Sequence, residues 1–185
     1  MPRPKASKVR HRIRDSPELV LSSSIDQSCE AKPPQKLKDG CVYHGTWKQD
    51  QRHGRGIQQW PDDSYYHGEW FADAANGKGR LIMRDGSMYE GNFVENMRHG
   101  DGDFFSVDGA EYRGRWINDK QDGQATEVWP TGAYYEGSYA KGFKHGKGTF
   151  RWSDNSTYTG EFYYNNIQGH GDYQWSDGRR YIGQW

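Results

Sequence analysis

The chain has 185 residues, with 25 basic and 25 acidic side chains and no formal net charge. This length fits one ordinary domain or one array of repeats, and no apolar stretch approaches the roughly 20 residues of a membrane-spanning helix. Only two cysteines are present, Cys29 and Cys41, which excludes a disulfide framework and favours an intracellular, reducing environment.

Residues 1–40 differ in composition from the rest of the chain. They contain no aromatic residue, but they hold five prolines and the run Ser22–Ser24. Such a segment buries too little apolar surface to offset its chain entropy, so we predict a disordered tail. Its first part carries only basic charges: Arg3, Lys5, Lys8, Arg10, Arg12 and Arg14. This cluster is a candidate site for an anion or an anionic lipid, and arms for nucleic acid or nuclear addresses share its composition. The alternative is a solvated tail without a partner.

From residue 43 onward, the pattern Tyr-x-Gly-x-aromatic returns every 23 residues without insertion or deletion. A fixed period of roughly 20 to 50 residues is the signature of a repeat architecture. The defining residues are Tyr43, Gly45, Trp47, Tyr66, Gly68, Trp70, Tyr89, Gly91, Phe93, Tyr112, Gly114, Trp116, Tyr135, Gly137, Tyr139, Tyr158, Gly160, Phe162, Tyr181, Gly183 and Trp185.

A second pattern, Gly-x-Gly, keeps the same period, and a turn signal such as Asp85-Gly86 closes most units. In the fourth unit, Ala125 replaces the second glycine. The glycines are Gly54, Gly56, Gly77, Gly79, Gly100, Gly102, Gly123, Gly146, Gly148, Gly169 and Gly171. Together, the two patterns closely resemble the MORN repeat over residues 43–185, which comprise six complete units and the opening of a seventh.

The resemblance carries implications for fold and function. It implies an elongated, single-layer sheet of β-hairpins. MORN arrays are associated with the cytoskeleton, with junctions between membrane and cytoskeleton, and with phospholipid. MORN repeats also precede phosphatidylinositol phosphate kinase domains and a SET-type lysine methyltransferase domain.

Each unit contains two candidate strands. Alternation places Tyr66, Gly68 and Trp70 on one face of the first strand, and His67 and Glu69 on the other. We expect a loop of about five residues before Gly-x-Gly, where the second strand begins. A glycine within a strand usually marks the close approach of another group, so we expect aromatic rings of neighbouring strands to cover these glycines.

The predicted fold class is therefore all-β, an elongated single-layer solenoid of stacked antiparallel β-hairpins. Residues 1–40 are assigned to the disordered basic tail, and residues 41–185 to the array. About thirteen strands at roughly 4.8 Å spacing give a sheet on the order of 60 Å long, which strand twist is expected to coil.

No combination of residues in the array predicts catalysis or metal binding. His53, His99 and His145 share one position in alternate units, about 19 Å apart, although zinc ligands lie about 2 Å from the metal. The recurring aspartates lie in turns, where they bond their own backbone, and no unit completes a nucleotide-binding motif. We therefore expect no cofactor, no metal and no catalytic residue within this chain.

We expect a non-enzymatic binding and scaffold module whose partners are proteins of the cytoskeleton or the membrane periphery. Acidic residues outnumber basic ones within residues 41–185, so nucleic acid is not an expected partner. For the same reason, we expect the basic tail, and not the array, to contact anionic phospholipid. This function implies a cytoplasmic location. The alternative is an N-terminal regulatory or targeting module of a longer enzyme, such as a phosphatidylinositol phosphate kinase or a SET-type lysine methyltransferase, with its catalytic domain beyond Trp185.

The last unit predicts self-association. Tyr181, Gly183 and Trp185 belong to a strand whose hairpin partner is missing, and an unpaired edge is a template for a second chain. Two copies that meet edge to edge would form a two-fold homodimer, and end-to-end pairing is known among MORN proteins as a family. Arg179 and Arg180 oppose this pairing because charge at an edge discourages it.

Overall fold

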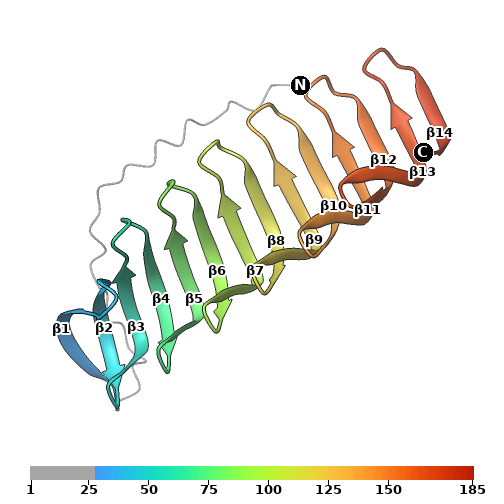
Figure 1. Ribbon diagram of the computed structural model, residues 1–185. Coiled ribbons are helices and arrows are strands. Elements are labelled where there is room, and N and C mark those ends of the chain that lie inside the picture. Colours follow the sequence, from blue (N-terminus) through green and yellow to red (C-terminus); the bar gives the residue numbers. More distant parts are fainter. Residues whose placement is uncertain (1–27) are drawn as a thin grey trace.

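The computed structural model describes residues 28–185, and the predictions for residues 1–27 lie outside the described residues. The described chain forms one antiparallel sheet, in which the order of the strands equals their order in the chain (Figure 1). The strands are β1 (Glu30–Lys36), β2 (Val42–Lys48), β3 (Gln51–Gln59), β4 (Tyr65–Phe71), β5 (Ala74–Ile82), β6 (Met88–Val94), β7 (Met97–Phe105), β8 (Glu111–Ile117), β9 (Lys120–Val128), β10 (Tyr134–Ala140), β11 (Phe143–Arg151), β12 (Thr157–Tyr163), β13 (Asn166–Gln174) and β14 (Arg180–Gln184).

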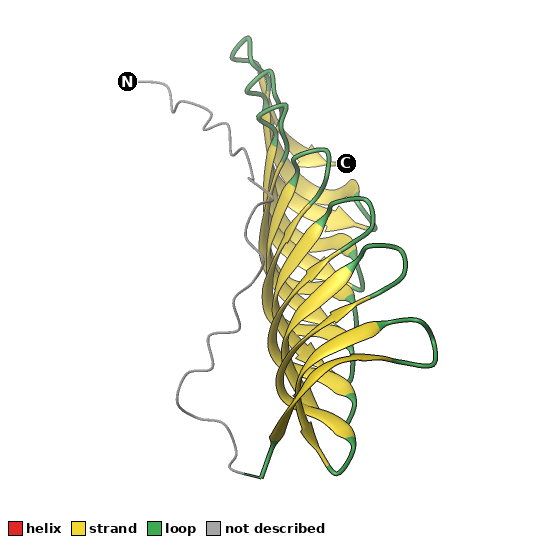
Figure 2. Ribbon diagram, turned by 90° about the vertical axis from the view of Figure 1, so that its left-hand side faces the viewer, coloured by secondary structure: helices red, strands yellow, loops and turns green. Residues whose placement is uncertain are grey.

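The sheet is a single twisted layer that is not closed into a barrel (Figure 2). Its long axis runs across the strands, so the molecule grows by one hairpin with each repeat. The predicted all-β array of antiparallel hairpins is therefore confirmed. The part of the chain that the structure describes contains no helix that could cross a membrane.

The sheet begins earlier than the sequence predicts. The assignment of residues 1–40 to a disordered tail is wrong for its last part, because β1 pairs with β2 and places Glu30 opposite Trp47. The pairing is irregular at Pro33 and Pro34. An edge strand tolerates prolines because one row of its amides has no partner strand. Backbone pairing with β2 therefore makes this segment a strand, although its composition is that of a tail.

Narrow turns of two residues join the strands of most hairpins. Both residues take positive φ, as at Ala72 (46°) and Asp73 (69°), which suits the twist of the flanking strands. The second strand therefore starts directly after the turn, as β5 does at Ala74. The predicted five-residue loop is wrong. Only its two central residues form the narrow turn, and the others belong to the two strands. Gly77, with φ of 97°, lies in a bulge that shifts the register of their pairing.

Wide turns connect each hairpin to the next. After β3, the amide of Ser64 donates to the carboxylate of Asp62, while Asp63 takes a φ of 68°. The glycines of the predicted turn signals also have positive φ: Gly86, Gly109, Gly132 and Gly178. This conformation is the one that glycine adopts without steric cost, which confirms the predicted turn chemistry.

One row of small residues crosses the sheet from β2 to β14. Gly68, for example, pairs with Gly56 on one side and Gly79 on the other. The row comprises Gly45, Gly56, Gly68, Gly79, Gly91, Gly102, Gly114, Ala125, Gly137, Gly148, Gly160, Gly171 and Gly183. The two glycine patterns of the sequence thus meet in one line.

The tyrosine of each unit covers this row. The hydroxyl of Tyr66 donates to the carbonyl of Glu69 at 2.9 Å, so the ring lies over Gly68 of its own strand and Gly79 of the next. The expectation that rings of neighbouring strands cover the glycines is correct for Gly79 and wrong for Gly68. The reason is that the tyrosine side chain leans along its own strand.

The buried core is a ladder of rings on the same face of the sheet. Tyr66 meets Trp70 edge-on, with 5.2 Å between ring centroids, and meets Phe93 of the next hairpin at 4.9 Å. Such edge-to-face pairs add roughly 0.5–1.5 kcal/mol beyond the area they bury. The almost fully buried tyrosines are Tyr43, Tyr66, Tyr89, Tyr112, Tyr135 and Tyr158. The ladder therefore extends the core from repeat to repeat and confirms the predicted inward face.

The end of the ladder differs from its middle. Tyr181 is 45% exposed, whereas its counterparts in the other repeats are buried. The ring of Trp185 packs against Tyr158 and Tyr173. The homodimer expected through this strand involves a second copy of the chain and stays a prediction.

Candidate functional site

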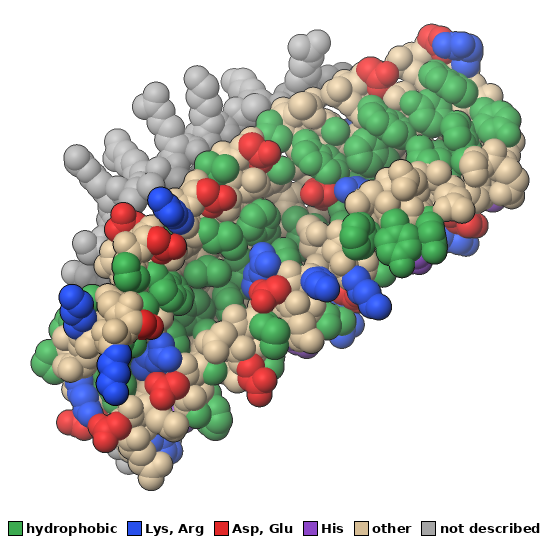
Figure 3. Space-filling model, in the orientation of Figure 1, with side chains coloured by type: hydrophobic (Ala, Val, Ile, Leu, Met, Phe, Trp, Pro, Cys, Tyr) green, Lys and Arg blue, Asp and Glu red, His purple; other side chains and the backbone are tan. Residues whose placement is uncertain are grey.

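The aromatic face of the sheet is hollowed along the long axis of the molecule (Figure 3). Hydrophobic side chains gather in the hollow, and charged side chains lie along its edges. The tyrosine ladder forms the floor. Partly buried side chains that pack against it are Trp60, Leu81, Phe104, Trp129, Phe150, Trp152 and Tyr173. We call this surface the aromatic groove.

Basic side chains lie on the rings of the aromatic groove in alternate repeats. The guanidinium of Arg52 lies 4.4 Å from the ring centroid of Trp70. The carboxylate of Asp73 accepts hydrogen bonds from the backbone amide and from Nε of Arg52, at 2.9 and 3.0 Å. The same unit recurs two repeats later with Arg98, Trp116 and Asp119. Since the carboxylate belongs to the narrow turn of the following hairpin, each unit fastens two hairpins together.

Lys144 holds the corresponding position in the fifth repeat. Its Nζ lies 2.8 Å from Oε2 of Glu127 and 4.8 Å from the ring centroid of Trp129. The hydroxyl of Tyr139 donates to the same carboxylate at 2.6 Å. Burial, followed by the charge of Glu127, raises the pKa of Tyr139, so its hydroxyl remains a donor. Glu127 is thus neutralised by a residue of the groove itself.

Replacing Arg98 with alanine is expected to lower the free energy of unfolding by about 1–3 kcal/mol, because Asp119 loses its partner and a cation–π contact disappears. Arg113 is the matched control on the opposite face. Its side chain is 59% exposed, against 20% for Arg98, and surface pairs such as those of Arg113 contribute about 0–1 kcal/mol. Urea denaturation of both variants measures the difference, and equal losses would contradict the role of Arg98.

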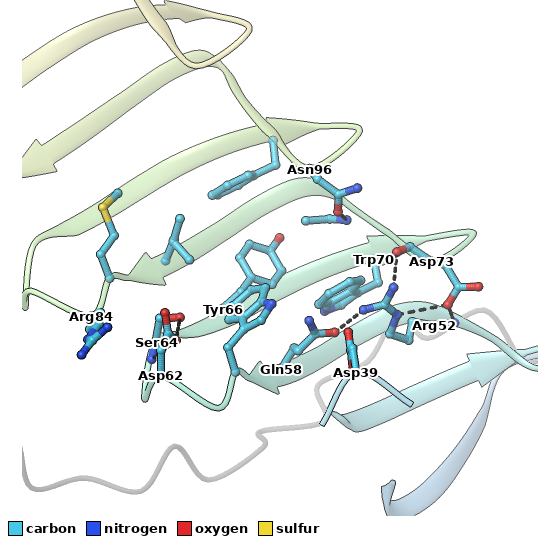
Figure 4. A pocket seen from close by; sticks show the side chains of 15 residues that line it. Asp39, Arg52, Gln58, Asp62, Ser64, Tyr66, Trp70, Asp73, Arg84 and Asn96 are labelled. Carbon is cyan, nitrogen blue, oxygen red and sulfur yellow. Dashed lines mark hydrogen bonds and ion pairs between the residues drawn. The ribbon is translucent and has the colours of Figure 1, made fainter. Parts of the chain in front are cut away.

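The second repeat lacks the arginine unit. Ala75 replaces the arginine and Asn96 replaces the aspartate, although the amide of Ala75 still donates to Asn96 at 2.8 Å. A pocket of about 620 Å³ lies at this point (Figure 4). Its walls include Trp60, Tyr66, Trp70, Leu81, Met83 and Phe93. Because the arginine and its carboxylate are absent together, this part of the wall is uncharged. We call it the Ala75 pocket.

Polar groups frame the Ala75 pocket at its two ends. In Figure 4, Arg52 and Asp73 lie together at one end, while Asp62 and Arg84 lie at the other. Arg52 also donates to the side chain of Gln58. The apolar walls thus accept an uncharged side chain, and the polar ends are available to the neighbouring groups of the same ligand.

The rim formed by the wide turns is rich in carboxylates. These are Asp39, Asp62, Asp63, Asp85, Asp108, Asp154 and Asp177. The hydroxyl and amide of Ser64 donate to Asp62 and hold the pKa of that carboxyl below its usual range, and Ser156 does the same for Asp154. Fewer basic side chains lie within these turns: Lys38, Arg84 and Arg179. The wide-turn rim is therefore negative.

The opposite face of the sheet carries charges of both signs in neighbouring strands. Arg80 and Glu90 form an ion pair at 2.9 Å, and Arg113 lies 3.9 Å from Asp103. Acidic and basic side chains thus offset one another across this face. Among the described residues, no three His, Cys, Asp or Glu side chains form a group that could hold a metal ion.

The repeat pattern of the sequence predicts the structural residues of the repeats but not the aromatic groove. The residues that give the groove its character occupy one position of successive repeats: Arg52, Ala75, Arg98, Gln121, Lys144 and Ile167. Basic and uncharged residues alternate at this position, and this two-repeat period is the signal that could have revealed them. The predicted anion-binding residues of the tail lie outside the described residues.

One protein family and several solved structures resemble this chain. The family model described as the MORN repeat matches residues 43–65, 66–88, 89–111, 112–134, 135–157 and 158–179. No curated protein sequence is significantly similar to the chain. The solved TCP10 domain of Danio rerio CPAP, in complex with a peptide of Danio rerio STIL, aligns with a TM-score of 0.46 and 14% identity over 82% of this chain and 72% of that chain.

A second solved structure aligns with a similar TM-score. The TCP domain of Drosophila melanogaster SAS-4 (dCPAP), in complex with a proline-rich motif of Ana2, aligns with a TM-score of 0.44 and 13% identity. The alignment covers 92% of this chain and 85% of that chain. Likeness at this level establishes neither a shared function nor a shared partner.

Proposed function

This chain belongs to the MORN-repeat family, and from that premise we propose that it is a non-enzymatic module that binds a segment of a partner protein in its aromatic groove. Repeat arrays are suited to this task because they offer a long, regular surface on a scaffold that is stabilised from repeat to repeat. The groove binds the segment, and the stacked hairpins keep its shape.

The Ala75 pocket is the observation that supports the proposal. Its aromatic and aliphatic walls surround a space large enough for one or more side chains, about 620 Å³. Buried anchors in such pockets supply most of the affinity of protein interfaces. The walls bear no charge where Ala75 and Asn96 replace the arginine and aspartate of the neighbouring repeats. The anchor is therefore an apolar side chain of the partner.

The wide-turn rim determines the charge of the partner segment. Its carboxylates lie beside the aromatic groove and outnumber the basic side chains there. Complementary charges steer association and suppress wrong partners. The occupant that fits is an extended polypeptide with an apolar anchor and basic side chains beside it. Polyanions such as nucleic acid are disfavoured by the same rim.

The double variant Ala75→Arg with Asn96→Asp tests this function. It restores the arginine unit in the second repeat and fills the Ala75 pocket, so we expect unchanged or higher thermal stability and loss of peptide binding. The matched control, Ala74→Arg with Asn96→Asp, adds the same charges but points the arginine to the opposite face of β5. The control is expected to bind like the original protein.

The probe is a phage-displayed library of random peptides selected on the original protein. Peptides that carry an apolar residue beside basic ones, and that bind the control but not the pocket-filled variant, are the expected result. Isothermal titration with one selected peptide then gives the affinities for the three proteins. Selected peptides that bind the pocket-filled variant with undiminished affinity would overturn the assignment of the site.

A further inference from the structure

Several carboxylates of the wide-turn rim lack an ion-pair partner among the described residues. Asp62, Asp85, Asp108 and Asp154 accept hydrogen bonds from turn residues, yet no ion pair of the described residues includes any of them. Turn hydrogen bonds hold the pKa of Asp62, Asp108 and Asp154 low, so these carboxylates stay ionised at neutral pH. A row of carboxylates with an excess of negative charge thus lies beside the aromatic groove, where it attracts a basic segment.

The chain itself contains a segment of that composition. Residues 8–14 read Lys-Val-Arg-His-Arg-Ile-Arg, so basic side chains alternate with Val9, His11 and Ile13. In an extended segment, alternate side chains point to opposite sides. One side therefore offers apolar anchors for the groove, and the other offers long cations that reach the rim. These are the two features that the Ala75 pocket and the wide-turn rim select.

The segment is also long enough to reach the groove. The described structure begins at residue 28, and β1 pairs alongside Trp47 at the first end of the aromatic groove. The 13 residues between this segment and residue 28 span up to about 43 Å when extended, and the Ala75 pocket lies only a few strands from β1, at roughly 4.8 Å per strand. A tethered segment also has an effective concentration in the millimolar range, which makes even a weak contact competitive.

We propose that residues 8–14 of this chain occupy the aromatic groove beside the wide-turn rim and cover the Ala75 pocket until a partner segment displaces them. The proposal rests on the proposed function, because it gives that same site a built-in competitor. It makes binding of a partner dependent on the N-terminal segment, and it makes the contact sensitive to salt because the rim contributes through charge.

Cleavage of the intact chain by trypsin tests the contact without an external ligand. Trypsin cuts after Arg10, Arg12 and Arg14, and a covered segment is cut more slowly. The rim variant replaces three carboxylates by amides that keep the turn hydrogen bonds: Asp62→Asn, Asp85→Asn and Asp108→Asn. The control makes the same change of charge on the opposite face: Glu90→Gln, Asp101→Asn and Asp103→Asn.

We expect the rim variant, and also the pocket-filled variant Ala75→Arg with Asn96→Asp, to be cut within the N-terminal segment roughly tenfold faster. The control variant is expected to be cut at the original rate, and added salt should accelerate cleavage of the original protein. Mass spectrometry of the products separates these cuts from cuts within the sheet. Equal rates in the original, rim and pocket-filled proteins would overturn the proposal.

The two proposals fail in different ways. If the tail is cut at equal rates but the selected peptides still require an open Ala75 pocket, the groove binds partners and the N-terminal segment does not occupy it. If the rim variant exposes the segment while no library peptide depends on the pocket, the groove has only its internal occupant. A third measurement links them: replacing Arg10, Arg12 and Arg14 by glutamine should raise the affinity for the selected peptide several-fold.

Discussion

Replacing Gly91 with valine is expected to lower the free energy of unfolding by at least about 2 kcal/mol. A Cβ at this position would lie 2.5 Å from the hydroxyl oxygen of Tyr89 and 2.6 Å from the Cα of Gly102. The backbone of β7 cannot retreat without breaking its pairing with β6, so the tyrosine ring must move. Movement of the ring removes its hydrogen bond to Asn92 and disturbs its contact with Phe93.

The neighbouring residue provides the control. Glu90 lies on the opposite face, where it is exposed and pairs with Arg80 at 2.9 Å. Replacing it with valine removes only a surface ion pair, for which we expect a loss of no more than about 1 kcal/mol. Urea denaturation of Gly91→Val and Glu90→Val gives the two values, and similar midpoints for the two variants would show that the faces of β6 are assigned wrongly.

Alkaline pH is expected to unfold the array in one cooperative transition above pH 10. Burial raises the pKa of Tyr89 and Tyr135 to about 12, and it raises the pKa of Tyr43, Tyr66 and Tyr112 as well. These groups are neutral in the folded protein and ionise more readily in the unfolded chain. Their contribution to stability is therefore complete below about pH 10 and is lost as the pH rises toward the folded-state pKa.

The effect is large because the ladder repeats the same group. Each tyrosine that ionises only in the unfolded chain lowers the free energy of unfolding by up to about 1.4 kcal/mol per pH unit above 10. Ultraviolet absorbance of tyrosinate and circular dichroism of the sheet, recorded together, should show one shared transition for the buried rings. The variant Tyr89→Phe removes one such group and should flatten the pH dependence. Ionisation of the buried tyrosines with an unchanged sheet signal would refute this account.

The sequence predicted those features of the fold that depend on a single repeat. Alternation around Gly68 placed Tyr66 and Trp70 on the buried face, which the structure confirms. The turn glycines were predictable for the same reason, because a position such as Gly86 needs a positive φ that few other residues adopt readily. Signals of this kind are local and recur in each unit, so they accumulate along the chain.

Other features depend on contacts between repeats, and the sequence did not reveal them. Ala72 and Asp73 take positive φ without a glycine, because the two strands that they connect impose the geometry of the narrow turn. β1 exists because β2 offers it an edge, whatever its composition. The Ala75 pocket likewise arises from rings and turns of three successive hairpins. The one signal of this pocket in the sequence is the alternation of basic and uncharged residues at the repeat position of Arg52, Ala75 and Arg98.

The simple order of the strands also determines how the molecule responds to force. Hydrogen bonds between antiparallel strands run perpendicular to them, and here that direction is the long axis of the sheet. A pull on the two ends therefore loads the pairs of strands in series, so the weakest pair separates first, and a hairpin that detaches leaves the pairing of the next one intact. We therefore expect the array to lengthen under tension as hairpins detach one after another, and to shorten again as each hairpin pairs once more with its neighbour.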